Sequence, residues 1–451
     1  MKPHVPGVLF ALSLVAFTSV LVAQESEKPL AFRIAVNLAL QNSASSGLSR
    51  TDLERAGATV GAARSQFLPS VTVGSALGYS HGFPLSLEGS APSLFDVNIQ
   101  GLLFNSAQRK YIEAAKIDVQ ATNAQNAERR NDVMMETVLA YMQLDLLDSY
   151  LSIQREQQQF AEKFQDIAGQ RVQVGLDSLM ELTRAKLAVA RTRLDIARTQ
   201  AAADALRQRL SQLTGLPPSA IRTSTETIPQ LPAVSQDDDL AAEAVSYNPT
   251  VKIAERIAAA KDLRAEAERK QLYPTVDLAG QYAVLAKYNN YTQYYQPGSF
   301  QRNNLSIGVV IRVPFVNPAL HAAAGVAKFD AVRAHQEAGR VKEQVGVETL
   351  KLQRSVQEMA AAREVAQLEH RLAEYEIEVT RAKIESGAAS LKDEENARVS
   401  EHERYTAYLS ASFDLDKAQV QLLRQIGNLE TWALGATTKP ETGKSGSSAI
   451  P

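Results

Sequence analysis

Histidines are the first side chains to test for chemistry, because an imidazole can bind a metal or carry a proton near neutral pH. Beyond the N-terminal segment the sequence has five of them: His81, His321, His335, His370 and His402. No two are four residues apart, and none has a partner at the spacing of a metal-ligand motif. We therefore expect all five to be surface or lumen residues.

Motifs for nucleophilic or phosphate chemistry are also missing from the sequence. No Gly-x-Ser-x-Gly segment offers a hydrolase nucleophile. Gly443-Lys444-Ser445 resembles the end of a phosphate-binding loop, but Thr438 stands where that loop needs glycine. The many carboxylates follow helix faces, where they are normally solvated. The sequence thus predicts no enzyme, no cofactor and no metal site.

Composition narrows the classes of partner. The 451 residues carry a formal net charge of −2, with 22% charged and 6% aromatic residues. Such a balance gives no basic face for nucleic acid. The chain has no cysteine, which excludes disulfides, thiolate metal sites and an N-terminal lipid anchor on cysteine.

The N-terminus has the pattern of a secretory signal peptide. Lys2 and His4 precede an apolar run over residues 8–22, and cleavage after Ala23 is plausible. A membrane anchor is the alternative, although the run is short for a spanning helix of roughly 20 residues.

The chain contains an internal repeat. The segment QFLPSV at residues 66–71 recurs as QLYPTV at 271–276, and GLDSL at 175–179 recurs as GAASL at 387–391. The matches are collinear, as in a tandem duplication. We divide the chain into a signal peptide (1–23), a first repeat (24–215), a linker (216–239), a second repeat (240–435) and a disordered tail (436–451). Each repeat should hold a helix, two strands and a long helical hairpin.

Four segments alternate apolar with polar or small residues, which is the pattern of strands with two different faces. Their apolar members are Val71, Val73, Leu77 and Tyr79; Val97, Ile99 and Leu103; Val276, Leu278, Tyr282 and Val284; and Leu305, Ile307, Val309, Ile311 and Val313. Two interpretations remain open: a soluble sheet with one buried face, or membrane strands with lipid on one face and a wet lumen on the other. In a bilayer, four strands would leave open edges, so other copies of the chain would have to close the sheet.

The helical segments are too long for a compact globule. Residues 106–171 contain no proline, and Pro318 opens a similar run to about residue 385; either would make a rod of roughly 100 Å. Apolar residues step by three and four, which predicts coiled-coil seams. The seam residues are Leu368, Leu372, Tyr375, Val379 and Ala382; Leu187, Ala190, Leu194, Ala197 and Ala201; and Leu409, Phe413, Asp416, Val420 and Leu423, with Asp416 the polar intrusion.

Glycines mark where these helices turn back. Gly175 and Gly387 suit the left-handed residue that ends a helix. Ser178 and Ser390 follow as candidate N-caps, each with an acidic residue three positions later.

With these features in order, the chain resembles the TolC-like outer-membrane efflux proteins over residues 30–434. Further motifs agree: Pro69 and Pro274 before strands, Leu103-Phe104-Asn105 and Pro314-Phe315-Val316-Asn317 after them, and the Val174-Gly175-Leu176-x-Ser178 turn. The sequence departs from the family after the strands, where Asn105-Ser106-Ala107 and Asn317-Pro318-Ala319 replace its frequent Asp-Gly-Gly.

The resemblance implies a fold that is mainly α with a membrane β part. Tandem-duplicated coiled-coil hairpins would form an α-barrel in the periplasm, and three chains of four strands would form a trimeric 12-stranded β-barrel in the outer membrane. The implied function is the channel subunit of a tripartite efflux or type I secretion system. It would be a passive duct for small molecules or proteins, working with a periplasmic adaptor (membrane fusion protein) and an inner-membrane pump.

The resemblance also implies site residues. The hairpin tips that would bind the adaptor are Val174, Gly175, Leu176, Ser178, Gly387, Ala388 and Ser390. The periplasmic gate would fall on Asp393, Glu394 and Asn396, where the family's second acidic position is the neutral Asn396. The alternative is that Asp393 and Glu394 are ordinary solvated carboxylates of a helix.

A different class of function stays open at this point. A secreted or surface coiled-coil scaffold or adhesin would explain the helices, but it leaves the paired two-faced strands unexplained. The adaptor itself is a third candidate, yet it would need only one hairpin.

Overall fold

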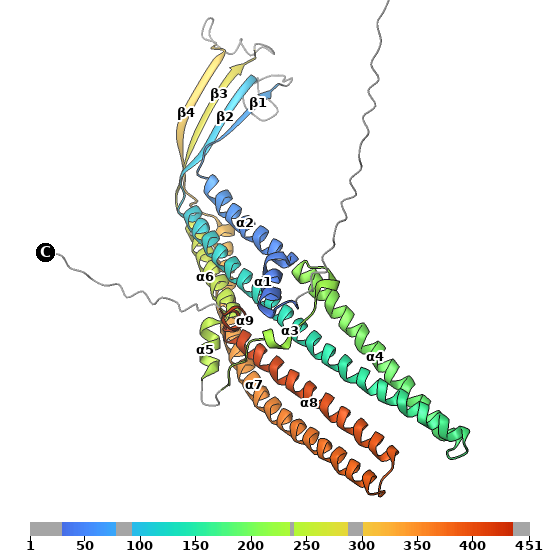
Figure 1. Ribbon diagram of the computed structural model, residues 1–451. Coiled ribbons are helices and arrows are strands. Elements are labelled where there is room, and N and C mark those ends of the chain that lie inside the picture. Colours follow the sequence, from blue (N-terminus) through green and yellow to red (C-terminus); the bar gives the residue numbers. More distant parts are fainter. Residues whose placement is uncertain (1–28, 78–92, 235–238, 287–300, 436–451) are drawn as a thin grey trace, which may run out of the picture.

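The computed structural model describes residues 29–77, 93–234, 239–286 and 301–435. The predicted signal peptide and tail, with Tyr79 and His81, lie outside these residues. The described part is long and narrow, with a sheet at one end and helices that run from it to separate hairpin tips (Figure 1). None of its helices combines the length and apolar character needed to cross a membrane.

The sheet consists of β1 (Ser70–Ala76), β2 (Ser93–Phe104), β3 (Thr275–Leu285) and β4 (Asn303–Arg312). Its order is β1-β2-β3-β4, and each neighbouring pair is antiparallel. The β2–β3 pairing therefore joins the first half of the chain to the second. Among the described residues, β1 and β4 are the edge strands, each with one neighbour.

Two long helices leave the sheet directly. α3 (Ser106–Gln173) follows β2 and α7 (Pro318–Glu385) follows β4, and both have 68 residues. The side chain of Asn105 accepts a hydrogen bond from the Gln108 amide at 3.0 Å, and Asn317 accepts one from the Leu320 amide at 3.2 Å. Asparagine is a strong N-cap. Each long helix therefore begins with a capped first turn, although the sequence lacks the family's Asp-Gly-Gly here.

The remaining helices repeat the same order in both halves. The first half has α1 (Phe32–Asn42), α2 (Ala44–Ser65) and α4 (Leu179–Thr214); the second has α5 (Leu240–Tyr247), α6 (Pro249–Lys270) and α8 (Leu391–Gln425). α2 and α6 both have 22 residues, while α4 and α8 have 36 and 35. Two 3₁₀ turns, η1 (Pro218–Ala220) and η2 (Thr225–Thr227), lie in the predicted linker, and α9 (Leu429–Leu434) ends the described chain. The exact repeat boundaries stay a prediction.

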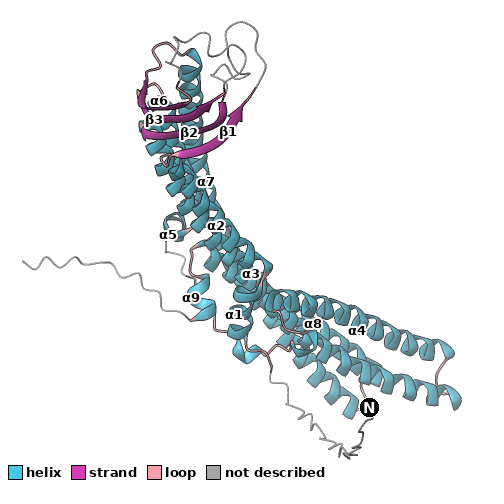
Figure 2. Cartoon of the chain, turned by 90° about the horizontal axis from the view of Figure 1, so that it is seen from above, coloured by secondary structure: helices cyan, strands magenta, loops and turns pink. Residues whose placement is uncertain are grey.

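The helices lie side by side in a fixed lateral order. Near the sheet, α3 packs between α2 and α6, and α6 packs against α7. Toward the tips, α3 packs between α4 and α8, and α8 packs against α7. One side of the molecule is therefore bordered by β1, α2 and α4 and the other by β4 and α7, as the two views together show (Figures 1 and 2). The helical and strand content, with two long hairpins, confirms the predicted fold class.

Candidate functional site

The strand register separates the sheet into two faces. Directly opposed residues share a face, and the register places Val71 opposite Ile99, Ile99 opposite Gly280 and Gly280 opposite Ile307. The same pairing places Asn98 opposite both Thr72 and Gln281, which in turn faces Ser306. One face is therefore apolar and the other polar across all four strands, as the alternation in the sequence predicts.

Every charged residue of the four described strands lies on the polar face. These residues are Asp96 on β2, Asp277 on β3 and Arg312 on β4. Asp277 is 8% exposed and forms an ion pair with Arg312, whose side chain is 69% exposed. The other carboxylate oxygen of Asp277, Oδ1, is buried without a hydrogen-bond partner among the described residues.

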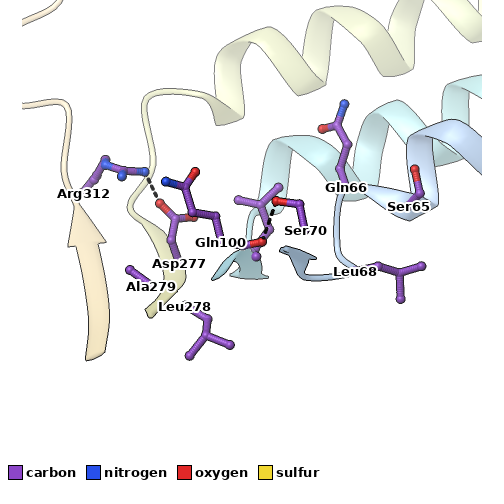
Figure 3. A pocket seen from close by; sticks show the side chains of 11 residues that line it. Ser65, Gln66, Leu68, Ser70, Gln100, Asp277, Leu278, Ala279 and Arg312 are labelled. Carbon is purple, nitrogen blue, oxygen red and sulfur yellow. Dashed lines mark hydrogen bonds and ion pairs between the residues drawn. The ribbon is translucent and has the colours of Figure 1, made fainter. Parts of the chain in front are cut away.

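A recess of about 460 Å³ lies at the foot of the sheet, beside this ion pair (Figure 3). Ser65, Gln66, Ser70 and Gln100 contribute to its lining from the first half of the chain, and Asp277 and Arg312 from the second. The Ser70 hydroxyl donates to the Gln100 carbonyl at 3.1 Å. The recess brings β1 and β2 together with β3 and β4, but it holds no arrangement of nucleophile and base.

The first hairpin tip has a defined backbone structure. Gly175 has φ +76°, and the Leu176 amide donates to the Arg171 carbonyl at 2.8 Å while the Gly175 amide donates to Val172 at 3.0 Å. This is the glycine-ended Schellman pattern. Ser178 then caps α4 by accepting from the Glu181 amide at 3.4 Å.

The second tip repeats this structure. Gly387 has φ +74°, the Ala388 amide donates to Lys383 at 2.7 Å and the Gly387 amide donates to Ile384 at 2.9 Å. Ser390 and Asp393 form a reciprocal capping box. The predicted turn glycines and caps are thus present in both tips, whereas a role in binding a partner stays a prediction.

The three predicted gate residues differ in their surroundings. Asp393 Oδ2 accepts from the backbone N–H and the hydroxyl of Ser390, at 2.8 and 2.7 Å. These hydrogen bonds, that of the backbone first, hold the pKa of Asp393 below its ordinary value. Glu394 is half-buried between the guanidinium groups of Arg381 and Arg398, at 3.4 and 3.3 Å. Asn396 is exposed.

The two tips of one chain also meet. Lys392 Nζ lies 3.7 Å from Glu181 Oε2, across a cleft of about 450 Å³ that Phe164 and Ile167 line on the α3 side. Burial raises the pKa of the nearby Glu395, the charge of Lys392 opposes this rise, and that of Glu181 adds to it. The exposed Lys392–Glu181 ion pair stabilises the contact between the tips by at most about 1 kcal/mol.

Two histidines are more buried than the sequence suggested. His370 on α7 places Nε2 3.0 Å from Glu401 Oε1 on α8, and His402 Nε2 lies 4.0 Å from the other oxygen of that carboxylate. Tyr405 and Tyr408 lie against the His370 ring, with centroids at 4.8 and 6.2 Å. The expectation of surface or lumen histidines is therefore wrong for this pair, which is largely enclosed between the helices of the second hairpin.

The predicted seams divide into a buried one and two exposed ones. Val420 and Leu423 on α8 are buried. On α7, by contrast, Leu368, Leu372, Tyr375 and Val379 stay exposed, and Leu187 and Leu194 stay exposed on α4. The predicted seams on α4 and α7, the two helices that border the molecule toward its tips, are therefore not covered within the chain.

Asp416, the polar intrusion in the α8 seam, is partly buried. Desolvation raises its pKa to about 6, and the charge of Arg363 opposes this rise. The described residues include no group of three or more His, Cys, Asp or Glu side chains arranged to hold a metal ion.

Comparison with known proteins agrees with this architecture. Residues 35–216 match the family model of the outer membrane efflux proteins. Among solved structures, the fold is similar to VceC of Vibrio cholerae (18% identity, TM-score 0.69), with 87% of this chain and 96% of that chain covered. CmeC of Campylobacter jejuni (16%, TM-score 0.71, 95% and 94% covered) and MtrE of Neisseria gonorrhoeae (16%, TM-score 0.70, 89% and 90% covered) are similar as well. No curated protein matches the sequence significantly.

The solved structures are named as an outer membrane protein or as outer membrane channels. At these identities they show a shared fold, and the family assignment comes from the first half of the chain. The family match over residues 35–216 agrees with the predicted family, and the solved structures confirm the predicted fold.

Proposed function

We propose that three copies of this chain, whose residues 35–216 match the family model of the outer membrane efflux proteins, form one passive export duct across the outer membrane. The observation that carries this proposal is the sheet, which has one apolar and one polar face and two unpaired edges within the described residues. An apolar face suits lipid and a polar face suits a wet lumen.

The free edges explain why one copy is insufficient. In lipid every backbone N–H and C=O needs a partner, so an open sheet edge is excluded. The two halves of the chain are alike, and β2 already pairs with β3 between them. By the same relation, β4 of one copy pairs with β1 of the next. A head-to-tail contact of this kind generates a ring when the rotation closes, and three copies would give twelve strands.

The exposed seams support the same assembly. α4 borders the tip region on one side and α7 on the other. In a ring, the α7 stripe of one copy, Leu368, Leu372, Tyr375 and Val379, would lie against the α4 stripe of its neighbour, Leu187 and Leu194. The α3–α8 packing inside the chain is the internal counterpart of this contact, because α7 repeats α3 and α8 repeats α4.

Partners would bind at the tips, which lie farthest from the sheet (Figure 1). At the first tip Val174, Leu176 and Met180 are exposed, at 70%, 67% and 58%. Apolar side chains at the end of a rod gain by being covered, which fits a periplasmic adaptor that connects the duct to an inner-membrane pump. The second tip offers the small residues Gly387, Ala388 and Ser390 instead, so we expect tighter backbone approach there.

Among the three predicted gate residues, the side-chain contacts favour Asp393 as the source of charge. Glu394 is paired with Arg381 and Arg398 and Asn396 is neutral, so Asp393 would supply the charge at the periplasmic mouth. Asp393→Asn keeps an oxygen for the helix cap and removes the charge. We expect it to lower the ratio of cation to anion permeability; an unchanged ratio would remove Asp393 from the gate.

A pair of matched variants tests assembly and partner binding together. Leu372→Glu and Leu176→Glu make the same chemical change at residues that are 60% and 67% exposed. We expect Leu372→Glu to abolish heat-sensitive trimers in the outer-membrane fraction. Leu176→Glu should keep the trimers and weaken binding of a purified adaptor.

The alternative of a secreted or surface coiled-coil scaffold makes the opposite forecast. Such a protein would be a soluble monomer or dimer that conducts no ions across a planar bilayer. Finding that for the purified mature protein would refute the duct.

A further inference from the structure

Charged residues of the strands can control which ions pass through the sheet region, an inference that rests on the proposed trimeric duct. We infer that three strand residues, Asp96, Asp277 and Arg312, set the ion preference of the part of the channel that the strands enclose.

All three residues lie on the polar face of the sheet. The register places Asp96 opposite Gly74 and Ala283, and Asp277 opposite Leu102 and Val310. Arg312, two residues after Val310, shares that face. On the lipid face near the bilayer centre an arginine would cost about 2–4 kcal/mol, and an aspartate less. The charged residues of the described strands all avoid that face, so they line the lumen.

The charged residues lie at two different heights along the sheet. Asp277 and Arg312 lie at the helical end of the sheet, whereas Asp96 pairs with Ala283, six residues farther along β3 than Asp277. At roughly 3.3 Å per residue, the two levels are about 20 Å apart along the strand, or about 15 Å along the channel if the strands tilt by about 40°. An ion passing through the duct would therefore meet them one after the other.

The two levels differ in whether the carboxylate is paired with a cation. The lower level is a neutralised pair, in which Arg312 covers one oxygen of Asp277. At the upper level, Asp96 accepts from Asn98 Nδ2 at 2.7 Å and from the Ser93 hydroxyl at 3.4 Å, both neutral donors. Asp96 forms no ion pair with any cation of the described residues.

Space beside Asp96 allows an ion to approach it. Gly74 lies opposite Asp96 on β1, and a Cβ atom at Gly74 would be 3.2 Å from Asp96 Oδ1. The glycine thus leaves that oxygen uncovered on its β1 side. Three copies would place three such carboxylates at one height, which favours cations over anions.

The test is the reversal potential of single channels of the mature protein in a planar bilayer under a potassium chloride gradient. Asp96→Asn should lower the K⁺/Cl⁻ permeability ratio at least about two- to threefold, which is the effect that a single carboxylate about 6–8 Å from one ion in water would have. Arg312→Gln should raise the ratio, because it leaves Asp277 unpaired. Asn98→Asp, which adds a carboxylate on the same face, should raise it as well.

The possible results separate the inference from the proposed function. If the wild-type protein forms no channels, the duct itself is wrong. If it conducts and the ratio is the same in all three variants, the strand charges do not control selectivity and the duct stands. Asp96 and Arg312 are not fully buried, and heat-sensitive trimers of each variant confirm assembly before the measurement.

Discussion

Tyr141 offers the sharpest test of how the middle of the molecule is held together. Its ring is fully buried, and its hydroxyl donates to the Leu30 carbonyl at 2.6 Å and accepts from the Ser224 amide at 3.0 Å. The Thr227 hydroxyl lies 3.1 Å away. One oxygen therefore connects α3 to the N-terminal segment and to the chain between the two repeats.

The size of the effect follows from these contacts. Tyr141→Phe keeps the ring in the core and leaves the Leu30 carbonyl and the Ser224 amide without their partner. Each unsatisfied buried group costs about 1–3 kcal/mol, and relaxation toward other partners recovers part of this. We expect the free energy of unfolding to fall by about 2–4 kcal/mol.

Tyr150→Phe is the matched control. Tyr150 is also on α3, but its hydroxyl lies 3.2 Å from the Thr406 carbonyl of α8, inside a helix that already uses its carbonyls. We expect a loss of about 0.5–1 kcal/mol there.

The chain supplies its own probe for this measurement. Trp432 is the single tryptophan of the sequence, and its ring lies 5.5 Å from Phe32, which in turn lies 5.4 Å from Tyr141. Urea unfolding of the protein in detergent can thus be followed by Trp432 fluorescence, with equal slopes required for comparison. If Tyr141→Phe unfolds at the wild-type midpoint, or Tyr150→Phe costs as much, the reasoning about this hydroxyl is wrong.

Three further predictions concern the second hairpin. Gly387→Ala should destabilise the tip by about 1–2 kcal/mol, because alanine disfavours the left-handed backbone of this residue. Amide hydrogen exchange at the tip should become faster, and unchanged exchange would contradict this prediction. Ser390→Ala removes the side-chain half of the capping box and should cost about 1 kcal/mol, seen as faster exchange in the first turn of α8 but not in α4. Asp416 has its pKa raised to about 6 by burial, so the folded state binds its proton more tightly than the unfolded state, and its contribution to stability is lost as pH rises through about 6. Asp416→Asn should thus raise the free energy of unfolding by about 1–2 kcal/mol at pH 8, after allowance for partial exposure, and change it little at pH 4; parallel behaviour of variant and wild type across this range would refute the assignment.

Local features of the fold were predictable because they depend on neighbouring residues. Asn105 and Asn317 cap the long helices, and Gly175 and Gly387 end them where the sequence indicates. Strand faces also follow from alternation, since the period of two is fixed by backbone geometry.

Pairings between distant segments were not predictable in the same way. The stepping of Leu368, Leu372 and Tyr375 marks a seam, but periodicity does not say which helix covers it. His370 and Glu401 lie 31 residues apart and meet only because the register of α7 against α8 brings them together. The pairing of Asp277 with Arg312 likewise depends on the register of β3 against β4.

The two halves of the chain meet where β2 pairs with β3, and their equivalent positions can carry different residues. The halves repeat the same order of elements, so in the proposed three-copy ring each equivalent position would occur six times, in two versions that can differ in sequence. Asp277 stands where the first half has Thr72, at the same offset of 205 that relates their flanking motifs. In the proposed three-copy ring the charge of Asp277 would therefore occur three times and not six, because the matching residue of the first half is the neutral Thr72.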